Sequence, residues 1–67
     1  MKISELNKLK DKNVFFKNPY GQIQEVTVKR VYLASHMVVY SINSQDFTGF
    51  AGEFFKTRED AEHASNY

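Results

Sequence analysis

Residues 13–28 read NVFFKNPYGQIQEVTV, two runs of strand-forming residues joined by a short polar segment. Residues 18–21, NPYG, have the composition of a turn, because proline fixes φ and glycine accepts a positive φ. In the second run Val26 and Val28 alternate with polar residues, which is typical of a strand with one buried and one solvated face. The stretch therefore predicts an antiparallel hairpin, and the rest of the fold is built outward from it.

The second strand of this hairpin is expected to run over residues 22–33 and to change phase on the way. Val31 and Leu33 are apolar at positions where the earlier alternation would place polar side chains. A β-bulge re-aims the side chains that follow it. We therefore predict a bulge or bend near Lys29 and Arg30.

Two further strands are predicted after the hairpin. Residues 37–42 are apolar on one face and partly apolar on the other, which favours a central strand. Residues 47–55 are interpreted as a fourth strand that Gly49 and Gly52 interrupt, and glycine within a strand indicates a bend or a close backbone approach. The bulge and these glycines would allow the sheet to curl.

A helix is predicted at each end of the sheet. Residues 3–11 carry an apolar stripe at spacing three, with Ser4 as the N-cap, and form either a docked helix or an arm that orders on a partner. Residues 57–64 begin at Thr57, a good N-cap, and present small alanines to the sheet. Tyr67 would extend this apolar stripe by one turn.

The predicted fold class is α+β: a small antiparallel sheet of three to four strands with a short N-terminal helix and a C-terminal helix. Residues 1–67 form one small domain, because the chain is too short for two. The predicted core consists of Val14, Val26, Val28, Val31, Leu33, Val38, Tyr40, Ile42 and Phe54.

Composition excludes several kinds of site. The chain has no cysteine, so it has neither disulfides nor thiolate metal sites, and His36 and His63 alone make a poor metal site. No catalytic or phosphate-binding motif is visible. We therefore expect a protein that is not an enzyme and uses no cofactor or metal.

No apolar run of membrane or signal length is present, which favours a cytoplasmic protein that does not bind membranes.

Six phenylalanines and four tyrosines are more aromatic mass than a core this small readily needs, so some rings are expected at the surface. The first hypothesis is a non-enzymatic protein-binding module, an accessory or inhibitor protein of the phage or mobile-element type that docks on a larger protein. An aromatic-centred patch would make the contact. The candidate protein-binding residues are Phe16, Tyr20, Tyr32, Phe47 and Phe50.

Two alternatives stay open. A small nucleic-acid-binding domain would hold phosphates with Lys17, Lys29 and Arg30 and stack bases on neighbouring aromatic rings of the sheet. The net charge of +1 does not show the strong basic excess that is typical of such proteins. A structural homodimer would instead bury the surplus aromatic rings between two copies.

Overall fold

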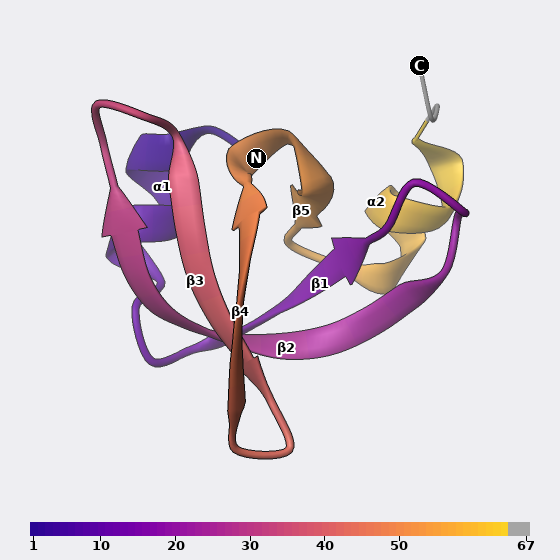
Figure 1. Cartoon of the computed structure of the whole chain (residues 1–67). Coiled ribbons are helices and arrows are strands. Elements are labelled where there is room, and N and C mark those ends of the chain that lie inside the picture. The colour runs from indigo at the N-terminus through magenta and orange to yellow at the C-terminus, as the bar shows by residue number, and fades with distance from the viewer. Residues whose placement is uncertain (65–67) are drawn as a thin grey trace.

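The computed structural model describes residues 1–64, and Tyr67 lies outside this part of the chain (Figure 1). In chain order the elements are α1 (Ile3–Lys8), β1 (Asn13–Lys17), β2 (Ile23–Tyr32), β3 (Met37–Ile42), β4 (Gln45–Phe50), the 3₁₀ turn η1 (Ala51–Glu53), β5 (Phe54–Phe55) and α2 (Arg58–His63).

The five strands form one antiparallel sheet in the order β4-β3-β2-β1-β5. The α+β class is therefore confirmed, whereas the sheet has five strands, more than the expected three to four. Residues 47–55 are not one interrupted strand: β4 ends at Phe50, η1 turns the chain, and the short β5 returns to pair with β1, opposite Phe15 and Phe16. In Figure 1 the sheet is strongly curved, and β5 lies within its concave side.

The N-terminal hairpin has the predicted form. Val14 pairs with Val26, and Lys17 pairs with Ile23. Gly21 has φ 86°, the positive value that the turn requires. The predicted bulge is also confirmed, because the register between β2 and β3 shifts between Val28 and Arg30.

The concave inner face of the sheet carries the core. Val14, Val26, Val28, Val38, Tyr40 and Phe54 are buried as predicted, while Val31 and Ile42 are partly buried against them. Leu33 is 54% exposed, so its assignment to the core is wrong. The strand ends at Tyr32, and Leu33 already belongs to the turn that follows. Leu6, Ala51 and Ala61 are also buried, although they were not among the predicted core residues. Leu6 and Ala61 do belong to the apolar faces predicted for the two helices.

The N-terminal helix is docked and does not extend as an arm. Leu6 is fully buried in the core, and the terminal ammonium of Met1 donates to the carbonyl oxygens of Ala51 at 3.3 Å and Phe54 at 2.7 Å. The predicted N-cap is wrong, because Ser4 lies inside α1 and Lys2 is the N-cap, without a side-chain hydrogen bond. Tertiary contacts, and not capping, therefore hold this short helix.

The C-terminal helix packs on the opposite, outer face of the sheet. Thr57 Oγ1 accepts the amide N–H of Asp60 at 3.1 Å, which confirms the predicted N-cap. The Arg58 guanidinium lies 5.4 Å from the centre of the Phe15 ring, and Lys17 Nζ donates to the carbonyl oxygens of Ala61 at 2.9 Å and Ala64 at 2.8 Å. Phe15 and Lys17 share the face opposite to Val14, so α2 covers the outer face over β1.

Replacing this lysine should loosen α2 without touching the core. In Lys17→Met the last carbonyls of α2 lose a cationic donor, and we expect the free energy of unfolding to fall by about 1–2 kcal/mol. Lys56→Met removes an exposed lysine as the matched control and should change it by less than about 0.5 kcal/mol. Urea unfolding measures both, and equal effects would show that the two hydrogen bonds do not hold α2.

Candidate functional site

The outer face is uncovered where β2, β3 and β4 lie side by side. The strand registers arrange its side chains in rows: Tyr32, Met37 and Phe50 form one row, and Arg30, Val39 and Thr48 form the next. We call these six residues the open patch. Tyr32, Phe50, Arg30 and Thr48 are exposed, and Met37 and Val39 are partly buried, so the open patch faces solvent in the described part of the chain.

Aromatic exposure is concentrated at one end of the open patch. Tyr32 is 44% exposed and Phe50 is 59% exposed, with the partly buried Met37 between them. Leu33, in the adjoining turn, adds further apolar surface. A contiguous apolar row of this kind on the surface of a small protein marks a candidate interaction site.

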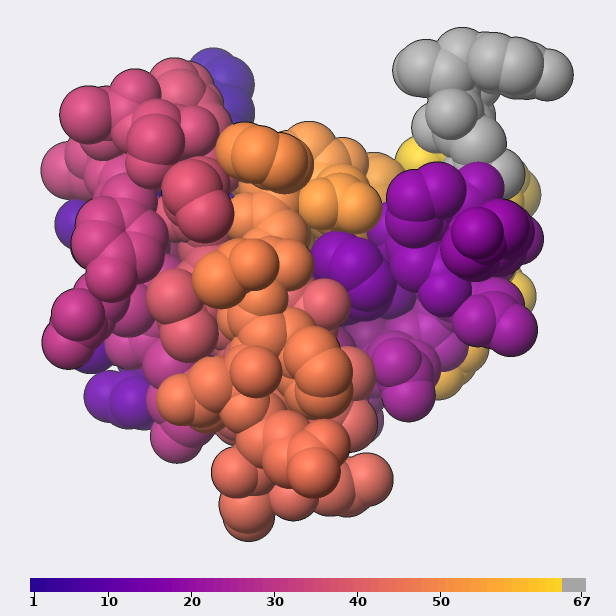
Figure 2. Space-filling view, in the orientation of Figure 1, coloured from indigo at the N-terminus to yellow at the C-terminus, as the bar shows by residue number. Residues whose placement is uncertain are grey.

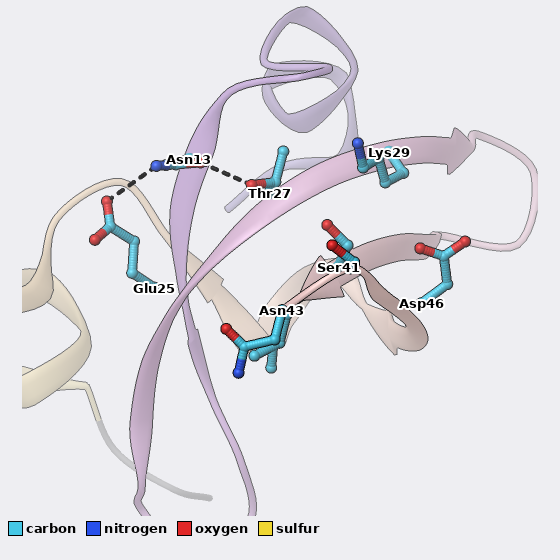
Figure 3. A pocket seen from close by; sticks show the side chains of 9 residues that line it. Asn13, Glu25, Thr27, Lys29, Ser41, Asn43 and Asp46 are labelled. Atoms are coloured by element: carbon cyan, nitrogen blue, oxygen red, sulfur yellow. Dashed lines mark hydrogen bonds between the residues drawn. The ribbon is translucent and has the colours of Figure 1, made fainter.

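A polar groove of about 740 Å³ continues the outer face beyond the open patch (Figure 3). Asn13 links two residues of β2 that line the groove. Its Nδ2 donates to Glu25 Oε2 at 3.3 Å, and its Oδ1 accepts from Thr27 Oγ1 at 2.8 Å. A smaller hollow of about 300 Å³ beside it also reaches Tyr32 and Val39 of the open patch. The lining residues common to both hollows are Lys29 and Asp46. The open patch therefore passes directly into a rim of mixed charge.

Arg30 is tied to the aromatic row. Its Nη1 donates to the Tyr32 hydroxyl at 3.3 Å. This hydrogen bond, together with the charge interaction with Tyr32, raises the pKa of the Arg30 guanidinium above its ordinary value. The hydrogen bond also aligns a cation with the exposed ring.

The structure separates the other candidate binding residues from this patch. Phe16 and Phe47 lie on the inner face, where both rings stack on Tyr40 at centroid distances of 4.7 and 5.8 Å. Tyr20 is 89% exposed in the turn between β1 and β2, which Figure 1 places across the molecule from the turn between β2 and β3. Of the five proposed aromatic residues, the structure brings together Tyr32 and Phe50.

The three candidate phosphate-binding residues are also divided. Lys29 and Arg30 are exposed on the outer face beside Tyr32. The Lys17 ammonium is held by the two α2 carbonyls and lies away from them. Sequence reasoning missed Met37 and Val39, although the partly apolar second face of residues 37–42 was the signal that identifies them.

Gly49 allows the inner aromatic stack to pass close beneath β4. A Cβ atom at this position would lie 3.2 Å from Phe16 Cε1 and 3.3 Å from Tyr40 Cε1. It would also lie 3.2 Å from Glu53 Oε1, which accepts the Phe50 amide N–H at 2.9 Å. The glycine therefore lets the chain pack β4, η1 and the stack together.

Tyr40 should make the domain less stable at alkaline pH. Burial, with a smaller contribution from Glu53, raises the pKa of the Tyr40 hydroxyl above its usual 10.0. Above that pH the unfolded chain loses the phenolic proton while the folded chain retains it, so the free energy of unfolding falls as pH rises. Below it both states are protonated and Tyr40 adds no pH dependence.

The measurement is urea unfolding between about pH 8.5 and about pH 11. Tyr40→Phe should lose this part of the alkaline decline, whereas Tyr20→Phe, at a tyrosine that is 89% exposed, should retain it. Identical slopes for the wild type and Tyr40→Phe would contradict the assignment.

Residues 1–64 contain no group of three His, Cys, Asp or Glu side chains that could hold a metal ion. Neither of the two described helices is long and apolar enough to cross a membrane. Comparison of this chain with known protein families, curated proteins and solved structures finds no match.

Proposed function

We propose that this chain is a non-enzymatic protein-binding module that docks on a larger protein through the open patch. The observation that carries the proposal is the row of Tyr32, Met37 and Phe50 across three adjacent strands, with both rings exposed. Protein interfaces are enriched in tyrosine, phenylalanine, methionine and arginine at their centres and polar at their rims. The open patch has this composition, with Arg30 beside the rings and Lys29 and Asp46 at the edge.

Rigidity supports the same proposal. The aromatic row is carried by three paired strands whose inner face packs on the core, so its backbone is ordered before a partner binds. A preorganised surface pays less conformational entropy on association than a loop does. Docking of this kind on a larger protein is how a small accessory or inhibitor protein would act, by covering the surface that the larger protein uses.

The charge pattern favours a protein over nucleic acid as the partner. Lys29 and Arg30 lie beside Tyr32, as the nucleic-acid hypothesis requires, yet Asp46 lines the same hollow and Glu25 lines the adjoining groove. Carboxylates beside the cations repel phosphates. The third candidate cation, Lys17, already neutralises the end of α2.

The experiment is a pull-down from lysate with the tagged chain, with and without nuclease, at low and at high salt. We expect a discrete protein band that survives nuclease and high salt, because an aromatic-centred contact depends little on ionic strength. Recovery of nucleic acid that is lost at high salt would contradict the proposal, since phosphate-driven binding falls steeply with salt.

A further inference from the structure

One long edge of the sheet is exposed. In the described part of the chain β4 has β3 as its one neighbouring strand, and Figure 2 shows β4, in orange, uncovered along the front of the molecule. Backbone N–H and C=O groups on such an edge are a template for another strand.

The hairpin between β3 and β4 determines which backbone groups face this edge. Asn43 at φ 51° and Ser44 at φ 69° form a two-residue turn between the paired Ile42 and Gln45. The pair that flanks such a turn exchanges both of its backbone hydrogen bonds, and bonded pairs then alternate along the strands. Gln45, Phe47 and Gly49 therefore bond to β3. The backbone groups of Asp46, Thr48 and Phe50 point outward.

Glu53 limits the free part of this edge. Its Oε1 accepts the Phe50 amide N–H, so that donor is already used. Within residues 1–64 the available pairs of N–H and C=O groups in β4 are those of Asp46 and Thr48. Between these two residues, Phe47 is 42% exposed at the end of the inner aromatic stack.

Little protects this edge against pairing. Natural edge strands commonly carry lysine, proline or several charges that block strand addition. The β4 sequence QDFTGF has one charged residue, Asp46, and neither lysine nor proline.

We propose that β4 pairs antiparallel with β4 of a second copy of this chain, about a two-fold axis at Phe47. In this register Asp46 of each copy lies opposite Thr48 of the other copy. The N–H groups of Asp46 and Thr48 in both copies then donate to free C=O groups across the new interface. The hydrogen bond between the Phe50 amide and Glu53 stays in place. The two five-stranded sheets become continuous, with both open patches on the same side.

The two neighbouring symmetric registers are poorer. An axis at Thr48 places Asp46 opposite Phe50, whose amide N–H Glu53 already holds. An axis at Asp46 places two carboxylates directly opposite each other, which is destabilising. The edge therefore selects the Phe47 register.

A second copy fits this edge because the Phe47 register is self-complementary. The Asp46 carboxylate faces a threonine hydroxyl at both ends, so each copy supplies the acceptor and the donor that the other needs. The two Phe47 rings meet on the axis and join the Tyr40 stacks of both copies. A foreign strand would have to reproduce each of these matches. The inference rests on the backbone edge of β4 and on Asp46, Phe47 and Thr48, of which only Thr48 belongs to the open patch. It does not depend on the proposed function.

Single cysteines test the register, because the chain has none of its own. Residues at position 47 would face each other as a non-hydrogen-bonded pair with Cα atoms about 4.5 Å apart, close enough for a disulfide. Residues at position 48 would be diagonal neighbours about 7–8 Å apart, beyond the usual range. Tyr20→Cys, in a distant exposed turn, reports random collision.

Under mild oxidation Phe47→Cys should form a covalent dimer at least about tenfold faster than Thr48→Cys or Tyr20→Cys, because only its sulfurs are held within bonding distance. Circular dichroism verifies that each variant is folded. Equal rates for the three variants, or the fastest rate for Thr48→Cys, would overturn the proposed register.

Sedimentation equilibrium over a range of concentrations tests the association without cysteines. Thr48→Lys places an ammonium opposite Asp46 at both ends, and should lower the dimer dissociation constant up to about tenfold. Asp46→Lys combined with Thr48→Lys places like charges opposite each other and should raise it. The proposal is overturned if the wild type stays monomeric at every concentration, if it pairs along β4 only with a foreign extended peptide, or if Thr48→Lys abolishes association.

Discussion

Phe54→Ala should remove a large part of the stability of the domain. The Phe54 side chain is fully buried, and its ring lies 5.3 Å from that of Phe16 and 5.4 Å from that of Tyr40. Truncating a buried phenylalanine to alanine costs about 3–5 kcal/mol. A domain of 67 residues has a total stability of only about 3–10 kcal/mol, so this loss removes a large part of it.

The matched control is Phe50→Ala, the same change on the outer face, where the side chain is 59% exposed. It should alter the free energy of unfolding by less than about 1 kcal/mol. Circular dichroism and urea unfolding compare the two variants. Comparable losses would contradict a core centred on the inner aromatic stack.

Tyr32→Ala combined with Phe50→Ala should abolish capture of the protein partner while the domain stays folded. Buried aromatic anchors contribute about 2 kcal/mol or more each to binding, so the dissociation constant should rise at least about 30-fold. Both residues carry their exposed rings on the open patch, so their removal leaves the inner core intact.

Tyr20→Ala is the control for this binding experiment, because Tyr20 is the most exposed large apolar residue within residues 1–64 and lies in the turn between β1 and β2. Its affinity should equal that of the wild type. Loss of binding in Tyr20→Ala, with normal binding in the double variant, would move the site to that turn.

The hairpin and the bulge could be predicted because local residues determine them. Gly21 supplies the positive φ of the turn, and the change of phase after Val28 is visible as the apolar pattern moves from Val28 to Val31. Thr57 was predictable as the N-cap for the same reason, since its partner lies three residues away.

Features that depend on distant contacts were missed. β5 is two residues long and is defined by its pairing with β1. An alternation of apolar and polar residues cannot be recognised over two residues, so the sequence pattern does not predict this strand. Leu6 lies on the apolar stripe predicted for residues 3–11, but its burial depends on the docking of α1 on the sheet, which the stripe alone left open. The predicted strand over residues 22–33 is one residue too long at each end, and Leu33 therefore lies in the exposed turn.

The candidate site was predicted in part. An aromatic-centred surface that includes Tyr32 and Phe50 was expected. The prediction placed five aromatic rings in one site, whereas in the structure two lie on each face of the sheet and the fifth lies in a turn. Phe47 and Phe50 are three residues apart on one strand, and alternation alone places them on opposite faces. Which of the two faces the core covers follows only from the packing of the whole sheet.

The most direct test of the open patch is methyl NMR on Met37 and Val39 during titration with the captured partner. Both side chains lie on the patch between the exposed residues and are themselves partly buried, so they report contact there. We expect their methyl signals to shift or broaden, while those of Ile23, beside the turn between β1 and β2, remain unchanged. Shifts at Ile23 with unchanged signals from Met37 and Val39 would contradict binding through the open patch.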